Sequence, residues 1–448
     1  MKIFDVRRLF QRTDDYLAGL LHGAGISFLL RVTGAGAAFL FNIILARKLG
    51  ADTVGLYFLA LTQITMVAVL ARLGLDSVLL RETAVQVSRK DWAAVAGGAR
   101  TGLRLVLIAS IALTSVLFLL APWLSEHVFD KPELAITLRW MSLAIPPLAM
   151  AFVYGELLKA LSLITRSQLV QVVLPTVLAI PVFLVFASAW GVWAAILAYG
   201  LGALAAAMLA ALFWRRAVYG KGKSRSISAR TLLNESLPLM WMQLLVQAIS
   251  WVDVLILGMF RPAAEVALYA VASRVAMLTS FIIVAVNNVT SPRFAALYSQ
   301  GDLAGLARMA VRSTRLTLVV SAPLLAIFIL FPHWILALFG RGFSAASTVL
   351  IILAIAQFFN VITGSVGQIL IMTGHGRALR NLSALNFVLC VALNLFLIPA
   401  YGAIGAAVAS ALSGTVLNIL GNFAVYRFHG IQVHLLAKCE PGSQEITA

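Results

Sequence analysis

Charge and cysteine are both scarce in this chain. Of its 448 residues, 11% are charged, 61% are hydrophobic and only 2 are cysteine. So little charge cannot cover a water-soluble surface of this size, which excludes an ordinary soluble protein and predicts an integral membrane protein. Cys390 and Cys439 lack the spacing of a metal or redox centre, so we expect two free thiols, no metal site and no cofactor.

Acidic residues are scarcer than basic ones, 17 against 34, and the formal net charge is +17. Such an excess does not require a nucleic acid partner, because basic inner loops beside anionic lipid headgroups explain it equally well. If the N-terminus is cytoplasmic, most of the lysines and arginines fall in inner segments, as the positive-inside rule requires. We therefore predict a bilayer protein with both termini cytoplasmic.

Long apolar runs are abundant in the chain. About 20 predominantly apolar residues in a helix cross a hydrocarbon core roughly 30 Å thick. These runs are continuous and contain Ala, Leu and Gly, so they predict helices instead of the shorter alternating strands of a β-barrel. Twelve such runs lie near residues 25–46, 54–77, 101–122, 135–158, 168–189, 191–214, 233–257, 264–289, 314–338, 345–373, 379–399 and 402–426.

The sequence also repeats itself at an offset of about 211 residues. Asp91 and Arg104 of RKDWAAVAGGARTGLR fall opposite Asp302 and Arg315 of QGDLAGLARMAVRSTR. A repeat of this length is a whole lobe, since solenoid units have roughly 20 to 50 residues. Because six helices return the chain to its starting side, the two repeats share one orientation, and a central cavity is expected between them.

Together these features predict an all-α integral membrane protein with twelve transmembrane helices in two parallel six-helix repeats. A basic segment without acidic residues separates the repeats. The expected parts are a cytoplasmic N-terminal segment (1–20), an N-lobe with helices 1 to 6 (21–214), a basic cytoplasmic linker (215–231), a C-lobe with helices 7 to 12 (232–428) and a cytoplasmic tail (429–448).

Apart from arginines close to the first residues of a span, such as Arg104 and Arg315, three arginines fall within the predicted spans. Arg31 lies in the first, Arg72 near the inner end of the second and Arg274 near the middle of the eighth. An arginine at the centre of a membrane helix costs roughly 2.5 to 3.5 kcal/mol, so it must face protein or water. Guanidinium groups match phosphate oxygens in pairs and stay protonated when partly dehydrated. We therefore take Arg274, Arg31 and Arg72 as candidate binding residues for a phosphate-bearing ligand.

Each of these arginines also has a structural interpretation. Arg72 and Asp76 are four residues apart and can pair on one helix face. Arg31 is shallow enough to extend toward the inner headgroups. Arg274 can be neutralised by a buried partner such as Asp253 in the seventh span. Asp253 and Asp76 are themselves candidates either for coupling to a proton or sodium ion or for a structural ion pair.

Three segments carry a family resemblance. They are RLGLDSVLLRETA (72–84), SPRFAALYSQGD (291–302) and AYGAIGAAVASALSG (400–414), which follow the second, eighth and eleventh spans in order. The chain resembles the polysaccharide-type flippases of the multidrug/oligosaccharidyl-lipid/polysaccharide exporter superfamily. Relatives that act on lipid II carry arginines on the first, second and eighth helices, where Arg31, Arg72 and Arg274 lie.

The resemblance implies a bacterial inner-membrane protein that moves a polyprenyl-pyrophosphate-linked oligosaccharide to the outer leaflet by alternating access, for O-antigen, capsule or exopolysaccharide synthesis. It implies a transporter and not an enzyme, without a cofactor. The expected partners are the lipid-linked oligosaccharide, the lipid bilayer and, beside them, a polysaccharide polymerase and glycosyltransferases. We expect a monomer.

Two alternatives stay open. A cation-coupled multidrug antiporter has the same architecture, but a site for cationic drugs needs carboxylates deep in the N-lobe, and the first span has none between Asp15 and Asp52. A membrane-bound glycan polymerase or ligase generally needs a sizeable outer loop. The outer loops here are short, and Glu126 and His127 are the only neighbouring acid and base among them. The lack of carboxylates in the first span favours an anionic cargo, and the short outer loops favour a transporter over an enzyme.

Overall fold

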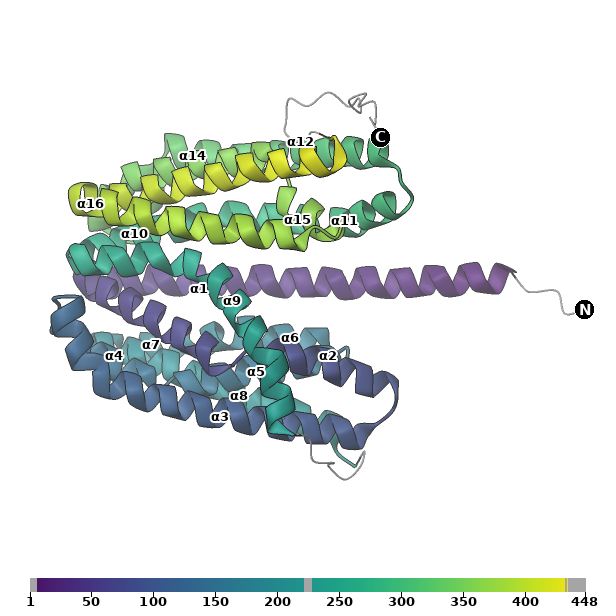
Figure 1. Cartoon of the computed structure of the whole chain (residues 1–448). Helices are drawn as coiled ribbons and strands as arrows, with labels where there is room; N and C mark the ends of the chain where they lie inside the picture. Colours follow the sequence, from purple (N-terminus) through teal and green to yellow (C-terminus); the bar gives the residue numbers. More distant parts are fainter. Residues whose placement is uncertain (1–5, 221–227, 432, 434–448) are drawn as a thin grey trace, which may run out of the picture. The chain divides into compact units, whose positions relative to one another are not determined.

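The structure is a computed structural model that describes residues 6–220, 228–431 and 433, with side chains from residue 29 onward. The described part is built of helices and contains no strand, which confirms the predicted all-α class (Figure 1). In chain order the helices are α1 (Val6–Ala71), α2 (Leu75–Ser88), α3 (Trp92–Trp123), η1 (Leu124–Val128), α4 (Leu134–Ser142), α5 (Ile145–Ala160), α6 (Ile164–Gln168), η2 (Leu169–Val173), α7 (Leu174–Trp190), α8 (Val192–Val218), α9 (Ala229–Phe260), α10 (Ala263–Ala276), α11 (Leu278–Ser299), α12 (Leu303–Leu330), α13 (Pro332–Ala337), η3 (Arg341–Ala346), α14 (Ser347–Thr363), α15 (Val366–Met372) and α16 (Gly376–His429).

The chain is a multi-pass membrane protein. Within the described residues, nine helical stretches are long and apolar enough to cross a membrane, or ten if the bent pair α4 and α5 forms one span. Two of the nine, Leu29–Ala71 and Gly376–His429, have 43 and 54 residues. Each is far longer than the roughly 20 residues that one crossing needs. Each also contains a backbone break, at Gly50 and Gly402 respectively.

Glycine makes both breaks possible. Gly50 has φ 77° and Gly402 has φ 56°, a region that residues with a Cβ atom rarely adopt. At Gly402 a Cβ would lie 2.0 Å from Oε2 of Glu265. That carboxylate accepts a hydrogen bond from the backbone N–H of Ala403 at 3.1 Å, so it caps the second stretch of α16. Figure 1 shows the two stretches of α16, yellow-green and yellow, folded back on each other.

The chain forms two compact units, and their boundaries lie inside helices. Unit 1 contains the residues up to Phe41 together with Val67–Leu120 and Leu138–Met242. Unit 2 contains Asn42–Met66, Ala121–Thr137 and the residues from Gln243 on. Two segments of the first sequence half therefore pack with the second half. The helices α1, α3, α4 and α9 each contribute to both units.

Small residues allow close helix packing within unit 1. Gly202 of α8 lies so near α7 that a Cβ would be 2.2 Å from the carbonyl oxygen of Pro175. Leu158, Val170 and Ala210 join α5, η2 and α8 in a buried apolar cluster. This packing fixes the helices on which Arg72 and Arg31 depend for their contacts.

Unit 2 has an apolar cluster at one end of its helices. Residues of α11, α12, α15 and α16 make up this cluster, among them the fully buried Phe294, Leu306 and Ile369. Polar side chains also join its helices: Asn418 of α16 donates to Asn360 of α14 at 3.2 Å, and Ser291 donates to Gln368 at 3.3 Å. The amides that are frequent in this half of the sequence therefore serve partly to connect helices.

Candidate functional site

Arg274 is held in unit 2 by an aromatic ring and a backbone carbonyl. Its guanidinium carbon lies 3.8 Å from the centre of the Phe58 ring, and Nη1 donates to the Ala270 carbonyl oxygen at 2.9 Å. Phe58 is fully buried and Arg274 is partly buried, so the cation lies against a dehydrated aromatic face. Within the described residues no carboxylate forms an ion pair with Arg274.

In the part of the chain that the structure describes, no acid compensates the positive charge of Arg274. A ring face attracts a cation without using its N–H groups, and a guanidinium has five N–H donors. The carbonyl of Ala270 takes one of them. The group thus keeps both its charge and several donors for an anion, a combination suited to the paired oxygens of a phosphate.

Asp253 does not neutralise Arg274, because its carboxylate is engaged elsewhere. Tyr269 donates to Oδ2 at 2.6 Å, and the hydroxyl of Ser410 donates to the same oxygen. Asn394 donates to Oδ1 at 2.8 Å, with the Cys390 thiol at 3.6 Å from that oxygen. Within the described residues Asp253 therefore forms no ion pair with Arg274, and its functional role stays a prediction.

The Asp253 cluster (Asp253, Tyr269, Cys390, Asn394 and Ser410) joins α9, α10 and both stretches of α16 inside unit 2. Asp253 is only 7% exposed, and its partners in the described part are all neutral donors. Oδ1 of the Asn394 amide is buried there without a hydrogen-bond partner. A buried acid in such surroundings is suited to take up a proton or a monovalent cation.

One of the two cysteines predicted to be free thiols, Cys390, belongs to this cluster. Cys390 is a free, buried thiol, whereas Cys439 lies outside the described residues. In the part of the chain that the structure describes, no three His, Cys, Asp or Glu side chains are grouped to hold a metal ion. Cys390 contacts Asp253 and Asn394 and adds a weak donor to an otherwise oxygen- and nitrogen-based cluster.

Arg72 and Asp76 form the ion pair that their spacing predicts. Nη1 of Arg72 lies 3.1 Å from Oδ2 of Asp76, and the two side chains are 13% and 7% exposed. The guanidinium carbon also lies 4.6 Å from the centre of the Phe152 ring. The charge of Arg72 is therefore compensated within unit 1, in contrast to that of Arg274.

Arg31 is the most exposed of the three candidate arginines. Its Nε donates to Oε1 of Gln168 at 3.3 Å, a contact between α1 and α6 within unit 1. No carboxylate pairs with Arg31 among the residues with described side chains. Arg31 and Arg72 belong to unit 1, and Arg274 belongs to unit 2.

Apart from the Arg72–Asp76 pair, sequence reasoning missed the partners of these groups. Nothing in the local pattern marks Phe58 or Phe152 as the ring beside an arginine. Tyr269 and Ser410 lie 16 and 157 residues from Asp253, so no helical period relates them to it. The only usable signal was the acid itself, since an aspartate inside an apolar span must find hydrogen-bond donors.

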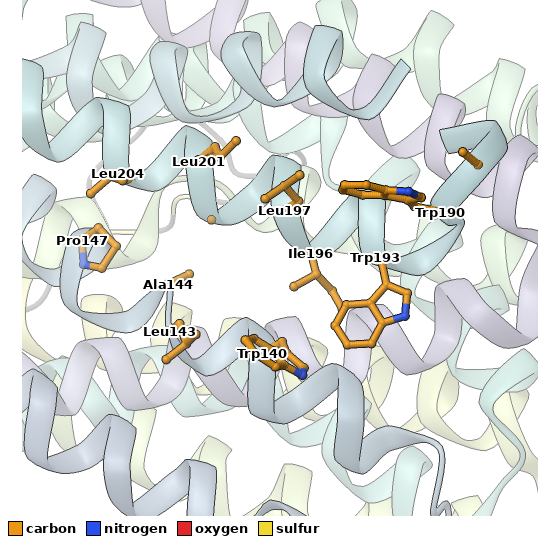
Figure 2. A pocket seen from close by; sticks show the side chains of 12 residues that line it. Trp140, Leu143, Ala144, Pro147, Trp190, Trp193, Ile196, Leu197, Leu201 and Leu204 are labelled. Atoms are coloured by element: carbon orange, nitrogen blue, oxygen red, sulfur yellow. The ribbon is translucent and has the colours of Figure 1, made fainter. Parts of the chain in front are cut away.

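An apolar pocket of about 860 Å³ lies within unit 1 between α4, α5, α7 and α8. The indoles of Trp140, Trp190 and Trp193 line one part of it, and aliphatic side chains such as Leu197 and Leu201 line the rest (Figure 2). None of its lining residues is charged. The pocket is suited to hydrocarbon, and its lining has no charged side chain that would hold a phosphate.

A family model described as "Polysaccharide biosynthesis protein" matches residues 20–298, more than half of the chain. The chain belongs to the polysaccharide biosynthesis protein family. A second family model, MatE, matches residues 238–396. These matches confirm the resemblance stated from the sequence and place this family member among the flippases of the multidrug/oligosaccharidyl-lipid/polysaccharide exporter superfamily.

Known proteins agree with this assignment. The family member is 29% identical over 406 residues to the probable low-salt glycan biosynthesis flippase Agl15 of Haloferax volcanii, covering 88% of this chain and 80% of the relative. Its fold matches an inward-facing multidrug resistance MATE family transporter with a TM-score of 0.72 at 18% identity, over 90% and 98% of the two chains. It also matches the lipid II flippase MurJ with a TM-score of 0.73 at 13% identity, over 90% and 87%.

Proposed function

We propose that this family member translocates a polyprenyl-pyrophosphate-linked oligosaccharide repeat unit from the inner to the outer leaflet of a bacterial inner membrane by alternating access. The observation that carries the proposal is the uncompensated guanidinium of Arg274 on the ring of Phe58. A pyrophosphate supplies the negative charge and the paired oxygens that this group lacks. The glycan-flippase relative Agl15 supports the same class of cargo.

The proposed architecture has twelve spans. It counts Leu29–Ala71 and Gly376–His429 as two crossings each, divided at Gly50 and Gly402. The lobes are the repeats 21–214 and 232–428, joined by the basic linker, with both termini cytoplasmic. With the inside negative, each negative charge that moves outward gains about 2.3 kcal/mol per 100 mV. The membrane potential alone can therefore drive part of the transport of a pyrophosphate.

In this proposal Arg274 binds the pyrophosphate during transit, and Arg31 and Arg72 contribute from the N-lobe. Arg31 has one amide contact and retains donors. Arg72 is paired with Asp76, so its contribution requires that it share its charge between the carboxylate and the cargo. Arg274 is accordingly expected to matter most of the three.

Asp253 is the proposed coupling residue. A carboxylate surrounded by neutral donors changes its charge when it binds a proton or a sodium ion, and the Tyr269 and Ser410 hydroxyls can reverse their hydrogen bonds to follow that change. If Asp253→Asn proteoliposomes flip labelled lipid-linked glycan with unchanged dependence on pH and sodium, the residue has no coupling role.

The alternative function is cation-coupled multidrug efflux, which the MatE match over residues 238–396 favours. The Arg274 site opposes it, because an uncompensated guanidinium repels a cationic drug. A glycan polymerase or ligase has less support, since the relatives named above are transporters by their descriptions. The partners proposed for the flippase are the glycosyltransferases and polymerase that make and use its cargo, and the flippase itself is proposed to work as a monomer.

The test reconstitutes the full chain in proteoliposomes with a fluorescent polyprenyl-pyrophosphate-linked oligosaccharide and follows its appearance in the opposite leaflet. Arg274→Gln removes the charge and is expected to slow translocation about 10-fold or more, because a charge-assisted hydrogen bond contributes about 1.5 to 3 kcal/mol. Arg274→Lys is expected to retain part of the rate. Arg293→Gln, at an exposed arginine of α11, is the control.

Equal rates for Arg274→Gln, Arg293→Gln and the wild type at matched protein levels would remove Arg274 from the mechanism. Export of a cationic dye by the wild type, with no movement of the glycan lipid, would instead support the multidrug alternative. Both outcomes are measured on the same vesicles, so a poorly reconstituted sample is recognised by loss of every activity.

A further inference from the structure

A second pocket of unit 1 is lined by arginines that take no part in the proposed transport site. It has a volume of about 540 Å³ and lies between the beginning of α3, the middle of α5 and the end of α8. Arg100 and Arg104 reach it from α3, and Arg215 reaches it from α8. Three guanidiniums therefore converge on one hollow at the surface of unit 1.

No acid among the described residues pairs with these three arginines. All three are exposed, and within the described residues none forms an ion pair with a carboxylate. Arg100 and Arg104 are four residues apart on one helix face, where like charges repel each other. A bound anion would relieve that repulsion and would be attracted by all three groups.

The pocket lies where a membrane surface is expected. α3 has 32 residues, and at 1.5 Å per residue it is about 48 Å long, well over the roughly 30 Å of a hydrocarbon core. Its residues from Trp92 to Arg100 precede the predicted span 101–122, so we expect Arg100 and Arg104 near the headgroup region of the predicted cytoplasmic side. Tyr154 and Trp214, the latter only 8% exposed, also line the pocket, and such aromatic residues are typical of membrane interfaces.

The pocket changes from charged to apolar along α3. Arg100 and Arg104 are followed one turn later by Leu107, which lines the same pocket and is 40% exposed. A free phosphate would use only the charged part. An amphiphile with an anionic headgroup and a hydrocarbon chain would use both parts, since its chain can continue along Leu107 toward the bilayer centre.

We propose that this pocket binds an anionic phospholipid of the inner leaflet, with its phosphate held by Arg100, Arg104 and Arg215. The site is separate from the Arg274 site and does not depend on the identity of the transported cargo. It links α3 to the end of α8, where the predicted basic linker (215–231) begins.

The experiment is native mass spectrometry of the full-length protein in detergent, titrated with phosphatidylglycerol or with phosphatidylcholine of the same chains. The wild type is expected to bind phosphatidylglycerol at least 10-fold more tightly. Each arginine-to-glutamine change in the pocket is expected to weaken that binding about fivefold, since a basic residue near an anionic surface contributes about 1 kcal/mol. The triple variant Arg100→Gln/Arg104→Gln/Arg215→Gln should lose roughly 100-fold.

The chain offers a matched control at the position 211 residues after Arg104. Arg315→Gln removes an exposed arginine at the corresponding place in the second repeat, outside this pocket, and should leave phosphatidylglycerol binding unchanged. Competition with inorganic phosphate and pyrophosphate separates a lipid site from a soluble-anion site. We expect millimolar phosphate to displace little of the bound lipid.

Three results would overturn the proposal: equal binding of the two lipids by the wild type, equal losses for Arg104→Gln and Arg315→Gln, or full displacement by phosphate. If the triple variant does not fold, the single variants and the lipid preference of the wild type still decide between these outcomes.

Discussion

Two buried aspartates should respond to the same substitution with very different losses of stability. Asp76 and Asp253 are 5% and 7% exposed. Asp76 pairs with the guanidinium of Arg72 at 3.1 Å, whereas Asp253 accepts hydrogen bonds only from neutral groups in the described part. Asp76→Asn therefore leaves a largely buried cation without its carboxylate. Asp253→Asn removes a charge that has no cationic partner.

The magnitudes follow from these surroundings. Removing one partner of a buried ion pair costs about 3 to 5 kcal/mol. Arg72 keeps 13% exposure and the Phe152 ring, so about 2 to 4 kcal/mol is expected for Asp76→Asn. For Asp253→Asn, three hydrogen bonds lose their charge assistance at about 1 kcal/mol each. The substitution also removes the cost of burying an ion, which is several kcal/mol. Because the two effects oppose each other, the free energy of unfolding should change by about 1 kcal/mol or less.

The assay is thermal unfolding of the full-length protein in detergent, followed by tryptophan fluorescence. One kcal/mol shifts the midpoint by about 2 to 4 °C in a unit of 150 to 250 residues, so Asp76→Asn should unfold well below the wild type. Asp253→Asn should stay close to it, as should the control Asp52→Asn at an exposed aspartate. A midpoint for Asp253→Asn as low as that of Asp76→Asn would show that the carboxylate is a structural anchor and refute this reasoning.

Two further predictions concern α1 and the segment after η1. Gly55→Ala should destabilise the protein by about 1 to 3 kcal/mol, because its Cβ would lie 1.8 Å from the Ala263 carbonyl oxygen; Gly36→Ala, with no atom within 4 Å, should not destabilise it. Equal midpoints for the two variants would contradict that contact. Lys131 donates to the Gly258 carbonyl oxygen at 2.7 Å, and burial lowers its pKa from 10.5, an effect that Asp130 partly offsets. Folding therefore disfavours the protonated amine, so the free energy of unfolding should rise with pH through the interval below 10.5. A rise of the same size in Lys131→Met, followed by chemical unfolding across this interval, would contradict it.

The sequence predicted features that follow from hydropathy along the chain or from the spacing of residues within one helix. Hydropathy indicated the helices, and the four-residue spacing of Arg72 and Asp76 predicted their ion pair. The sequence could not predict contacts between distant segments, such as Phe58 beside Arg274 or Ser410 beside Asp253. A π-helical turn such as η1 also went unpredicted, because one changed hydrogen-bond step leaves the apolar periodicity nearly intact.

The grouping of residues within lobes was likewise beyond the sequence. The repeats predicted one lobe for each half, yet Asn42–Met66 and Ala121–Thr137 pack with the residues from Gln243 on. Apolar runs are interchangeable in composition, so hydropathy gives no information on which helices become neighbours. Close approaches such as that of Gly55 to Ala263 decide this, and they depend on the shape of both partners.

The boundaries between the two units cross α1, α3, α4 and α9 within their helical stretches. A displacement of one unit against the other would therefore have to bend continuous helices. Flexible loops at these boundaries are not available to absorb it. Pro122 in α3 and Pro238 in α9 lie within a few residues of such a boundary. Each removes a backbone hydrogen bond and makes its helix more compliant at that point. We therefore expect the helices shared by the two units to resist such a displacement elastically and to bend most readily at these two prolines.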